Sequence, residues 1–500
     1  MNVRKLKSGV AAILVAGLSM SMFACGEKET SSYKSLDSAT REEVAQIASA
    51  DDRLTGELEN KTIKWMSNWD INPDGTGKNT PIELAIFQER YGGQVEYHMI
   101  DWSTRYDSLA NAINGDEGID FFPASDLDAF PRGAIRGMFV PVDDYIDYST
   151  PLWSDVKQAN DMMLWNGKHY VIVNQVTGDK CAVIYNRKTV EEAGLEDPAA
   201  LYKKGEWTWD AFQKMLTKFV DPDEGFYGID GWWFESGLSA TCGVPYVGLK
   251  DGKLVNNLKD PAIERVQNWM YDLYTTNCVA IGVGDFGWTA QPTYIKEGKT
   301  LFYPCGLWAM YCSADQWQNN FGEDAFFVPM PKDPNTSEYY IPCGLDGYVM
   351  VKGGKNPQGV AKFAECKRLT LLNERAAELG EEQMFKDYGW TQEMVDMKKS
   401  MDELALANPY FDFYTGVTPD ITNILDSNEN GIRAASKGTP WSESVSAVYA
   451  QIDAFLKDVN DHPVSDTVKT EYGGTAQHCR KTRRKSSGLC IHRAKPVFSL

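Results

Sequence analysis

Short β-forming runs alternate with amphipathic helical segments along the first third of the chain. Strands are predicted at residues 61–66 and in QVEYHMI and GIDFFPAS. Helices are predicted in PIELAIFQERYG and in STRYDSLANAING, the latter with Ser103 as its N-cap. A similar rhythm restarts after residue 165, and residues 357–457 are predicted to be mostly helical. Strands and helices that alternate every ten or so residues indicate βαβ units, so we expect an α/β fold with a largely parallel sheet.

Length and composition narrow the class of protein further. A chain of 500 residues is too long for one hydrophobic core, so two or three lobes are expected. The formal net charge of −20 repels phosphate backbones, which argues against nucleic acid as a partner. Not all of the 15 Trp side chains can be buried, so several should line a cleft or face. Trp65, Trp207 and Trp269 lie in a strand or on helix faces and are expected in the core.

The N-terminus has the pattern of an export signal. Arg4, Lys5 and Lys7 precede an uncharged run over residues 8–24, which is short for a membrane span. An uncleaved membrane anchor is the alternative interpretation. The residues MFAC, followed by glycine, resemble a bacterial lipoprotein cleavage box, although Met22 and Phe23 are unusual there.

This lipobox resemblance implies a signal peptide over residues 1–24, lipid attachment at Cys25 and a polar tether over 25–59. At the other end, residues 464–500 are expected to form a disordered tail. From residue 473 onward the tail has seven basic residues and no acidic one, leaving −27 on the rest of a chain whose total is −20. A basic arm that binds an anionic surface is the alternative.

Neither the cysteines nor the acidic turns predict a metal site. The body has seven cysteines, an odd number, with no CxxC and no Cys/His spacing suited to zinc. The fragments DINPDG and DSNENG match the first half of a calcium-binding EF-hand loop. However, the twelfth position is Pro81 in one and Lys437 in the other, where a bidentate Glu is required. Turn formation is the simpler interpretation, so no metal and no cofactor are expected.

Catalytic signatures are scarce. GxSxG, HExxH and GxxxxGK[ST] do not occur. A glycoside hydrolase needs only a pair of carboxylates, and a Trp-rich cleft suits sugars, so this enzyme class remains the alternative to a binding protein. It requires two carboxyl groups about 5 to 10 Å apart across a cleft.

Several segments, taken in order, carry a family resemblance. They are VIVNQVTGDKCAVIYNRKTVEEAGLEDP, GEWTWDAFQKML, YIKEGKTLFYPCGLWAM, FFVPMPKDP and GLDGYVMVKGGKNPQGVAKFAECKRLTL. With them, the stretch from about residue 60 to 460 resembles the family 1 extracellular solute-binding proteins. These are capture subunits of ABC importers, mostly for carbohydrates, and include maltose-binding protein. Cys305 and Leu307 depart from the family pattern near its G-x-W segment.

The resemblance implies a two-lobed periplasmic-binding-protein-like (class II) fold with hinge crossovers and a helical C-terminal part. The first crossover is placed near residues 173–176 and the second near 341–346. Lobe one is then 60–173 plus 346–395, and lobe two is 177–343 plus 396–463. Ligands in such folds bind at the carboxyl ends of strands.

The chemistry of a sugar selects the candidate site residues. A pyranose has apolar faces and a rim of hydroxyls, so flat aromatic rings stack on it while carboxylates and amides bind its rim. Strand-end loops and the proposed hinge offer both kinds of side chain. The predicted ligand-binding residues are Trp308, Trp69, Asp126, Trp233, Trp232, Trp102, Trp288, Asp346, Gln175, Asp70 and Glu235. Trp232 and Trp233 are neighbours on an extended segment, so one of them should point inward.

The sequence therefore predicts a non-catalytic, monomeric and extracytoplasmic lipoprotein that captures a sugar or oligosaccharide for an ABC permease. Glycerol phosphate, polyols and peptides are alternative ligands. A phosphate ligand would require Arg or Lys in loops that are instead mostly acidic and aromatic.

Overall fold

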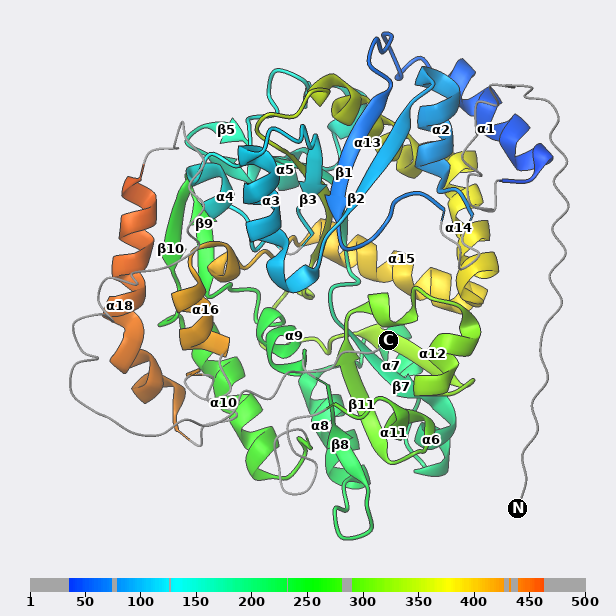
Figure 1. The fold of residues 1–500 in the computed structure, drawn as a ribbon. Coiled ribbons are helices and arrows are strands. Elements are labelled where there is room, and N and C mark those ends of the chain that lie inside the picture. Colours follow the sequence, from blue (N-terminus) through cyan, green and yellow to red (C-terminus); the bar gives the residue numbers. More distant parts are fainter. Residues whose placement is uncertain are drawn as a thin grey trace, which may run out of the picture.

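Two mixed sheets organise the protein, one in each half of the view in Figure 1. The structure is a computed structural model that describes residues 36–73, 79–125, 127–231, 233–280, 290–426, 431–432 and 439–462. Within these residues, no helix is both long enough and apolar enough to cross a membrane.

The first sheet has five strands in the order β2-β1-β3-β13-β6. Its strands are β1 (Thr62–Ser67), β2 (Gln94–Met99), β3 (Phe121–Pro123), β6 (Val171–Thr177) and β13 (Gly344–Met350). β1 pairs in parallel with β2 and β3, and α2 (Ile82–Tyr91) and α3 (Arg105–Asn114) lie in the connections between these strands. β13 runs antiparallel to both β3 and β6.

The second sheet has four strands in the order β12-β7-β11-β8. Its strands are β7 (Ala182–Asn186), β8 (Tyr227–Ile229), β11 (Thr300–Cys305) and β12 (Ala325–Pro329). β8 and β11 are parallel, whereas β7 is antiparallel to β11 and β12. The expectation of a largely parallel sheet is therefore wrong for this half. β7 and β13 each enter from the other sheet, so no helical crossover within one half forces them to be parallel.

The remaining elements surround these sheets. The other strands are β4 (Leu164–Trp165), β5 (Lys168–His169), β9 (Val247–Lys250) and β10 (Lys253–Asn256). The other α-helices are α1 (Ser38–Ala50), α4 (Arg132–Ile135), α5 (Lys157–Asp161), α6 (Arg187–Glu192), α7 (Pro198–Lys203), α8 (Trp209–Phe219), α9 (Phe234–Ala240), α10 (Pro261–Thr275), α11 (Thr293–Lys296), α12 (Ala314–Phe321), α13 (Pro357–Leu372), α14 (Glu374–Tyr388), α15 (Gln392–Ala407), α16 (Pro419–Asp426) and α18 (Trp441–Asp461). The 3-10 helices are η1 (Trp102–Thr104), η2 (Pro151–Trp153), η4 (Leu307–Met310) and η5 (Tyr414–Gly416).

The chain passes between the two sheets twice. β6 ends at Thr177 and β7 begins at Ala182, so residues 178–181 form a first linker. β12 ends at Pro329 and β13 begins at Gly344, so residues 330–343 form a second linker. The expected crossover at 173–176 lies in β6, just before the first linker, and the one at 341–346 spans the end of the second linker and the start of β13.

Helix α1 corrects the expectation of a polar tether that reaches residue 59. Val44 and Ala48, one turn apart, are fully or almost fully buried, and Leu54 and Leu58 are buried after the helix. The side chain of Asp37 caps the helix by accepting a hydrogen bond from Thr40 N at 3.0 Å. Residues 36–59 therefore belong to the folded body. Cys25, the expected signal peptide and the basic tail lie outside the described residues.

Two hydrophobic clusters form the core. The first contains α1, α2 and α13 packed on one face of the five-stranded sheet, with Trp65 completely buried. The second extends from the other face of that sheet into the four-stranded sheet and includes Trp207. Trp269 packs against the second cluster and stacks on Trp209 with ring centroids 4.3 Å apart. The predicted core positions of Trp65 and Trp207 are thus confirmed, whereas Trp269 is only partly buried. All seven body cysteines are free thiols.

Helix capping shows one correct and one wrong prediction. Thr208 caps α8 by accepting a hydrogen bond from Ala211 N, as its position before Trp209 predicts. Ser103 does not cap the next helical segment. Asp101 does so, because its carboxylate accepts from Ser103 N at 2.8 Å and thereby starts η1.

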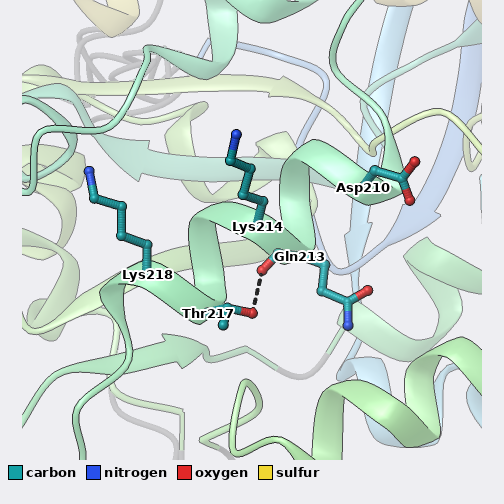
Figure 2. A pocket seen from close by; sticks show the side chains of 5 residues that line it. All are labelled: Asp210, Gln213, Lys214, Thr217 and Lys218. Atoms are coloured by element: carbon teal, nitrogen blue, oxygen red, sulfur yellow. Dashed lines mark hydrogen bonds between the residues drawn. The ribbon is translucent and has the colours of Figure 1, made fainter.

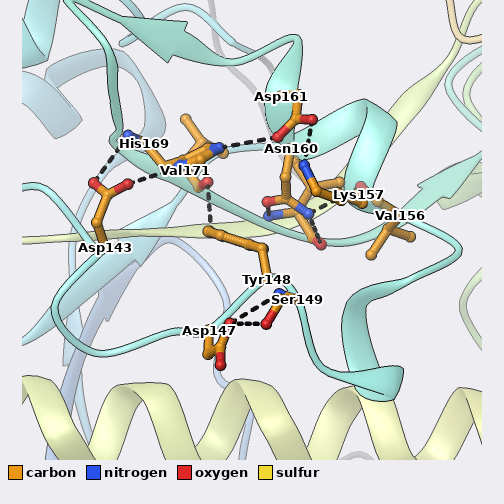
Figure 3. Close-up of polar contacts among 11 residues, drawn as sticks. Asp143, Asp147, Tyr148, Ser149, Val156, Lys157, Asn160, Asp161, His169 and Val171 are labelled. Atoms are coloured by element: carbon orange, nitrogen blue, oxygen red, sulfur yellow. Dashed lines mark hydrogen bonds and ion pairs between the residues drawn. The ribbon is translucent and has the colours of Figure 1, made fainter.

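β6 is an edge strand, and polar side chains from α5 and its neighbours cover it (Figure 3). Asn160 pairs with Val173 as a neighbouring strand would, accepting from Val173 N at 2.9 Å and donating to Val173 O at 3.1 Å. Just before β6, the ring nitrogens of His169 contact the carboxylates of Asp143 and Asp161 at 2.8 and 3.4 Å. These contacts hold in place the strand that leads into the first linker.

Helix α15 crosses the middle of the molecule between the two sheets and packs on β6 and β12 (Figure 1). Its C-terminal half contacts the first linker directly, because Gly178 N donates to Asp402 Oδ1 at 2.9 Å. A Cβ atom added at Gly178 would lie 2.4 Å from Met401 O. Glycine is required here for close packing, since backbone atoms cannot move aside as a flexible side chain can.

A pair of glycine substitutions tests this contact. Gly178→Ala should lower the free energy of unfolding by about 1–3 kcal/mol, the usual cost of overpacking. Gly380→Ala is the control, because nothing lies within 4 Å of its added Cβ in α14. That change should leave stability unchanged or raise it by up to about 1 kcal/mol. Urea unfolding measures both values. A Gly178→Ala protein as stable as the parent would contradict the packing described.

Candidate functional site

Most of the exposed aromatic side chains in the described residues lie at the carboxyl ends of strands. Among the described residues, the large hydrophobic side chains that are exposed are Trp69, Met99, Trp102, Phe226, Val255, Trp308 and Leu406. Four of them, Trp69, Met99, Trp102 and Trp308, lie at or just after the ends of β1, β2 and β11. The carboxyl ends of β1, β2 and β3 point toward the other half of the molecule (Figure 1). Loops at such strand ends are where α/β proteins bind ligands.

The buried Trp65 contacts both the backbone and the ring of Trp69. Trp65 Nε1 donates to Trp69 O at 2.9 Å, and the two rings meet edge to face at 5.6 Å. Trp69 nevertheless keeps 41% of its surface exposed. Asp70, also predicted as a ligand residue, accepts hydrogen bonds from the backbone and side-chain nitrogens of Asn72 at 2.9 Å. This is an Asx turn, which is the turn chemistry expected for this fragment.

Trp102 contacts Arg105, a cation that was not predicted from the sequence. The guanidinium of Arg105 lies 3.4 Å from the centre of the Trp102 ring. Arg105 also bonds Asp128, so it ties the loop after β2 to the loop after β3, where Asp126 was predicted to act. Asp126 itself lies outside the described residues. The spacing of Trp102 and Arg105, three positions apart at a helix start, was the available signal for their contact.

Met99 is the second residue that the sequence analysis missed. It ends β2 opposite Ser67 and is 79% exposed, the largest value among the exposed hydrophobic side chains described. A flexible, exposed thioether at this strand end offers an adaptable apolar surface.

Trp308 lies in η4, directly after β11, and 61% of its surface is exposed. Gly306 makes its position possible, because a Cβ there would lie 2.3 Å from the indole ring. The indole therefore lies across the backbone at the end of the strand. Of the predicted site residues that the structure describes, Trp308 offers the most exposed aromatic surface.

Asp230, Trp233 and Glu235 follow β8 and lie in the same half of the molecule as Trp308. β8 pairs with β11, the strand that precedes Trp308, and α9 packs on β11. Trp233 is partly buried and packs against the core. Glu235 lies partly buried in the first turn of α9. Trp232 and Trp288 lie outside the described residues.

Asp230, which immediately precedes these residues, is fully buried and accepts hydrogen bonds from Gln291 N and Gly231 N at 2.7 and 2.5 Å. Burial raises its pKa to about 6, although the two N–H groups offset part of the effect. Its carboxylate joins two loops at the end of the strand and is already engaged on both oxygens.

The hinge residues Asp346 and Gln175 are cross-strand partners, next to an irregularity in which β6 has one residue more than β13. Asp346 contacts Lys367 at 3.3 Å, and Lys367 also contacts Glu83 at 2.6 Å. Burial opposes the charge of Lys367, but Asp346 and Glu83 outweigh it and raise its pKa well above the ordinary value. Gln175 Nε2 lies 3.4 Å from Asp402 Oδ2. Both predicted residues therefore belong to a charged network between the strands and α13 and α15.

Two hollows lie away from all of these residues. One, of about 430 Å³, is a shallow depression over α8, lined by Asp210, Gln213, Lys214, Thr217 and Lys218 (Figure 2). The other, of about 270 Å³, lies near the end of β13 and includes Asp144, Lys168 and Gly353. Neither contains any predicted ligand-binding residue, and neither combines exposed aromatic faces with carboxylates as the strand ends do.

The buried carboxyl group of Asp230 should make the free energy of unfolding depend on pH. Its folded-state pKa of about 6 exceeds the ordinary value of 3.8, so the folded state holds the proton more tightly. The resulting stabilisation is present below about pH 4 and is lost as pH rises to 6, by about 3 kcal/mol in total. Asp230→Asn removes this dependence. The difference in unfolding free energy between the parent and the variant should therefore shift by that amount between pH 4 and 7.

Glu393→Gln is the control, because the contribution of Glu393 to stability changes with pH in the opposite direction. The hydrogen bond from Arg187 is the main cause that lowers the pKa of Glu393 to about 2. Its stabilisation is present above about pH 4.5 and is lost as pH falls toward 2. A difference between the parent and Asp230→Asn that does not change with pH would contradict the buried carboxylate described.

Comparisons with known proteins identify the family. The model of the family "Bacterial extracellular solute-binding protein" matches residues 69–366, more than half of the chain. A search of curated proteins gave no match.

Solved structures are similar in fold. A cyclo/maltodextrin-binding protein complexed with maltotetraose has a TM-score of 0.56 and 17% identity, covering 82% of this chain and all of that one. The galacto-N-biose/lacto-N-biose I-binding protein of the Bifidobacterium longum ABC transporter, in complex with lacto-N-biose, has a TM-score of 0.56 and 14% identity, with the same coverage. An ABC transporter solute-binding protein from Agrobacterium vitis with bound D-mannitol has a TM-score of 0.50 and 16% identity, covering 81% of this chain and 99% of that one.

These matches confirm the predicted α/β fold of two-lobed binding proteins and the predicted family. The chain belongs to the bacterial extracellular solute-binding proteins, and its place of action is outside the cytoplasm.

Proposed function

We propose that this protein captures a carbohydrate between its two halves and delivers it to the permease of an ABC importer. The observation that carries the proposal is the set of exposed aromatic side chains at strand ends, Trp69, Trp102 and Trp308, which come from both halves of the molecule. Flat aromatic surfaces stack on the apolar faces of sugar rings, and the carboxylates near the hinge suit the hydroxyl rim.

The relatives support the same class of ligand. The structures similar in fold contain maltotetraose, lacto-N-biose and D-mannitol, which are all rich in hydroxyl groups. Two of these proteins are described as parts of ABC transporters. The predicted contact residues, including Asp126, Trp232 and Trp288 outside the described part, remain our proposal for the ligand site.

The proposed mechanism is binding without catalysis. A ligand that contacts aromatic residues of both halves makes all of its contacts only when the halves approach, so it shifts the population toward the closed form. The two linkers at 178–181 and 330–343 are the segments that would bend, and they separate the proposed lobes. The closed form would then present one continuous surface to the permease. A lipid at Cys25 would keep the monomeric protein near that partner.

A ligand screen tests the proposal. We expect mono- or oligosaccharides to raise the melting temperature of the mature domain and to change its Trp fluorescence. Trp308→Ala should weaken binding of the same carbohydrate by about ten- to a hundredfold, the effect of losing about 1–3 kcal/mol of stacking, without lowering stability. Phe226→Ala is the matched control. Phe226 is also an exposed aromatic residue, with 41% of its surface exposed, but it precedes β8 and so lies at the opposite end of that strand. If only a peptide or a phosphate ester shifts either signal, the carbohydrate proposal is wrong.

The anchor requires a separate experiment. Mass spectrometry of the protein extracted from membranes should find Cys25 as the first residue, carrying acyl chains. Cys25→Ser should abolish acylation while leaving carbohydrate binding unchanged. A mature N-terminus at any other residue would contradict the proposed anchor.

A further inference from the structure

One linker residue, Asp179, holds both ends of the short helix that carries Trp308. At the start of η4, Leu307 N donates to the backbone oxygen of Asp179 at 3.0 Å. At its end, the hydroxyl of Tyr311 donates to Asp179 Oδ2 at 2.6 Å. Trp308 lies between these two attachment points. A three- to four-residue 3-10 helix has little rigidity of its own, so external contacts set the orientation of its side chains.

The same carboxylate also joins the two linkers. The hydroxyl of Thr177, the last residue of β6, donates to Asp179 Oδ1. Gly344, where the second linker enters β13, pairs with Thr177 and lies against both groups. A Cβ at Gly344 would be 2.4 Å from Thr177 Oγ1 and 2.8 Å from Asp179 Oδ1. Any bending of either linker therefore displaces atoms that contact Asp179.

Tyr311 connects this point to the helices behind it. Its ring packs on Tyr388 and Trp390, each with a centroid distance of 5.5 Å, and Trp390 Nε1 donates to Met310 O at 3.1 Å. Burial, and then the charge of Asp179, raise the pKa of Tyr311 well above its ordinary value. The hydroxyl therefore keeps its proton and acts as the donor to Asp179.

We infer that Asp179 is a positioning residue that couples the orientation of Trp308 to the conformation of the two linkers. Bending of the linkers moves Asp179, and through Leu307 and Tyr311 it turns η4. Conversely, a ligand that fixes Trp308 favours one linker conformation. This inference goes one step beyond the proposed function, and its relevance to ligand capture rests on that proposal.

The coupling can be measured without a ligand by hydrogen–deuterium exchange. Tyr311→Phe removes one hydroxyl and keeps the ring packing. Losing a hydrogen bond to a charged group costs about 1.5–3 kcal/mol, so exchange should become about tenfold faster or more. The acceleration is expected together in three segments, 304–312, 176–182 and 341–347. Thr177→Val, which removes the other hydroxyl donor, should accelerate the same three segments.

The matched control is Tyr91→Phe, because Tyr91 is a buried tyrosine whose hydroxyl donates to Thr55 O at 3.0 Å, far from the linkers in sequence and fold. It should leave exchange in the three segments unchanged. If Tyr311→Phe accelerates only residues 304–312 and both linker segments exchange as in the parent, the inference is wrong.

A binding measurement then connects the coupling to function. For a carbohydrate identified in the screen, Asp179→Asn should change the affinity at least severalfold. One of the two oxygens that accept from Thr177 and Tyr311 becomes an NH2 group, which cannot accept. The side chain of Asp179 need not touch the ligand for this effect. An unchanged affinity would overturn the role in capture. If no carbohydrate binds the parent protein, the proposed function fails, whereas the exchange experiment still decides the coupling.

Discussion

The pairing of β6 with β13 is the contact on which the rest of the structure depends. β6 leads into the first linker, the second linker leads into β13, and the two strands run antiparallel beside each other. β6 accommodates one extra residue where Gln175 and Asp346 meet, which is a local irregularity that bends and twists a strand pair. Both passages between the sheets therefore lie side by side and form one hinge region, against which α15 packs on β6 and β12.

The charged side chains around this strand pair form ion pairs. Lys367 lies between Glu83 and Asp346, and Lys398 contacts Asp402 at 2.6 Å. Burying an isolated charge is costly, whereas a charge with partners and hydrogen bonds is tolerated. Removing one member would leave another buried without its partner. The network therefore fixes how α13 and α15 sit against the hinge strands, more than it adds to overall stability.

Local sequence patterns predicted much of the architecture and some of the site. The strands at residues 61–66 and 94–100, the cap at Thr208 and the buried Trp65 and Trp207 follow from alternation, capping chemistry and spacing. The exposure of Trp69, Trp102 and Trp308 was also predictable, since large aromatic residues just after strands are more exposed than those within them. Helix α1 was missed because its apolar residues are few and separated by polar ones, so its burial depends on α2 and α14.

Sequence alone determined the chemistry of this protein: a chain of alternating strands and helices, with aromatic and acidic residues after the strands and a lipobox-like start. Only the tertiary structure decided which of those residues act together. Lys367 binds Asp346, 21 positions away, and Asp179 holds η4 through Tyr311, 132 positions away. The reason is physical. Propensity and capping act over a few neighbouring residues, whereas contacts between distant residues exist only after the chain has crossed twice between its two sheets.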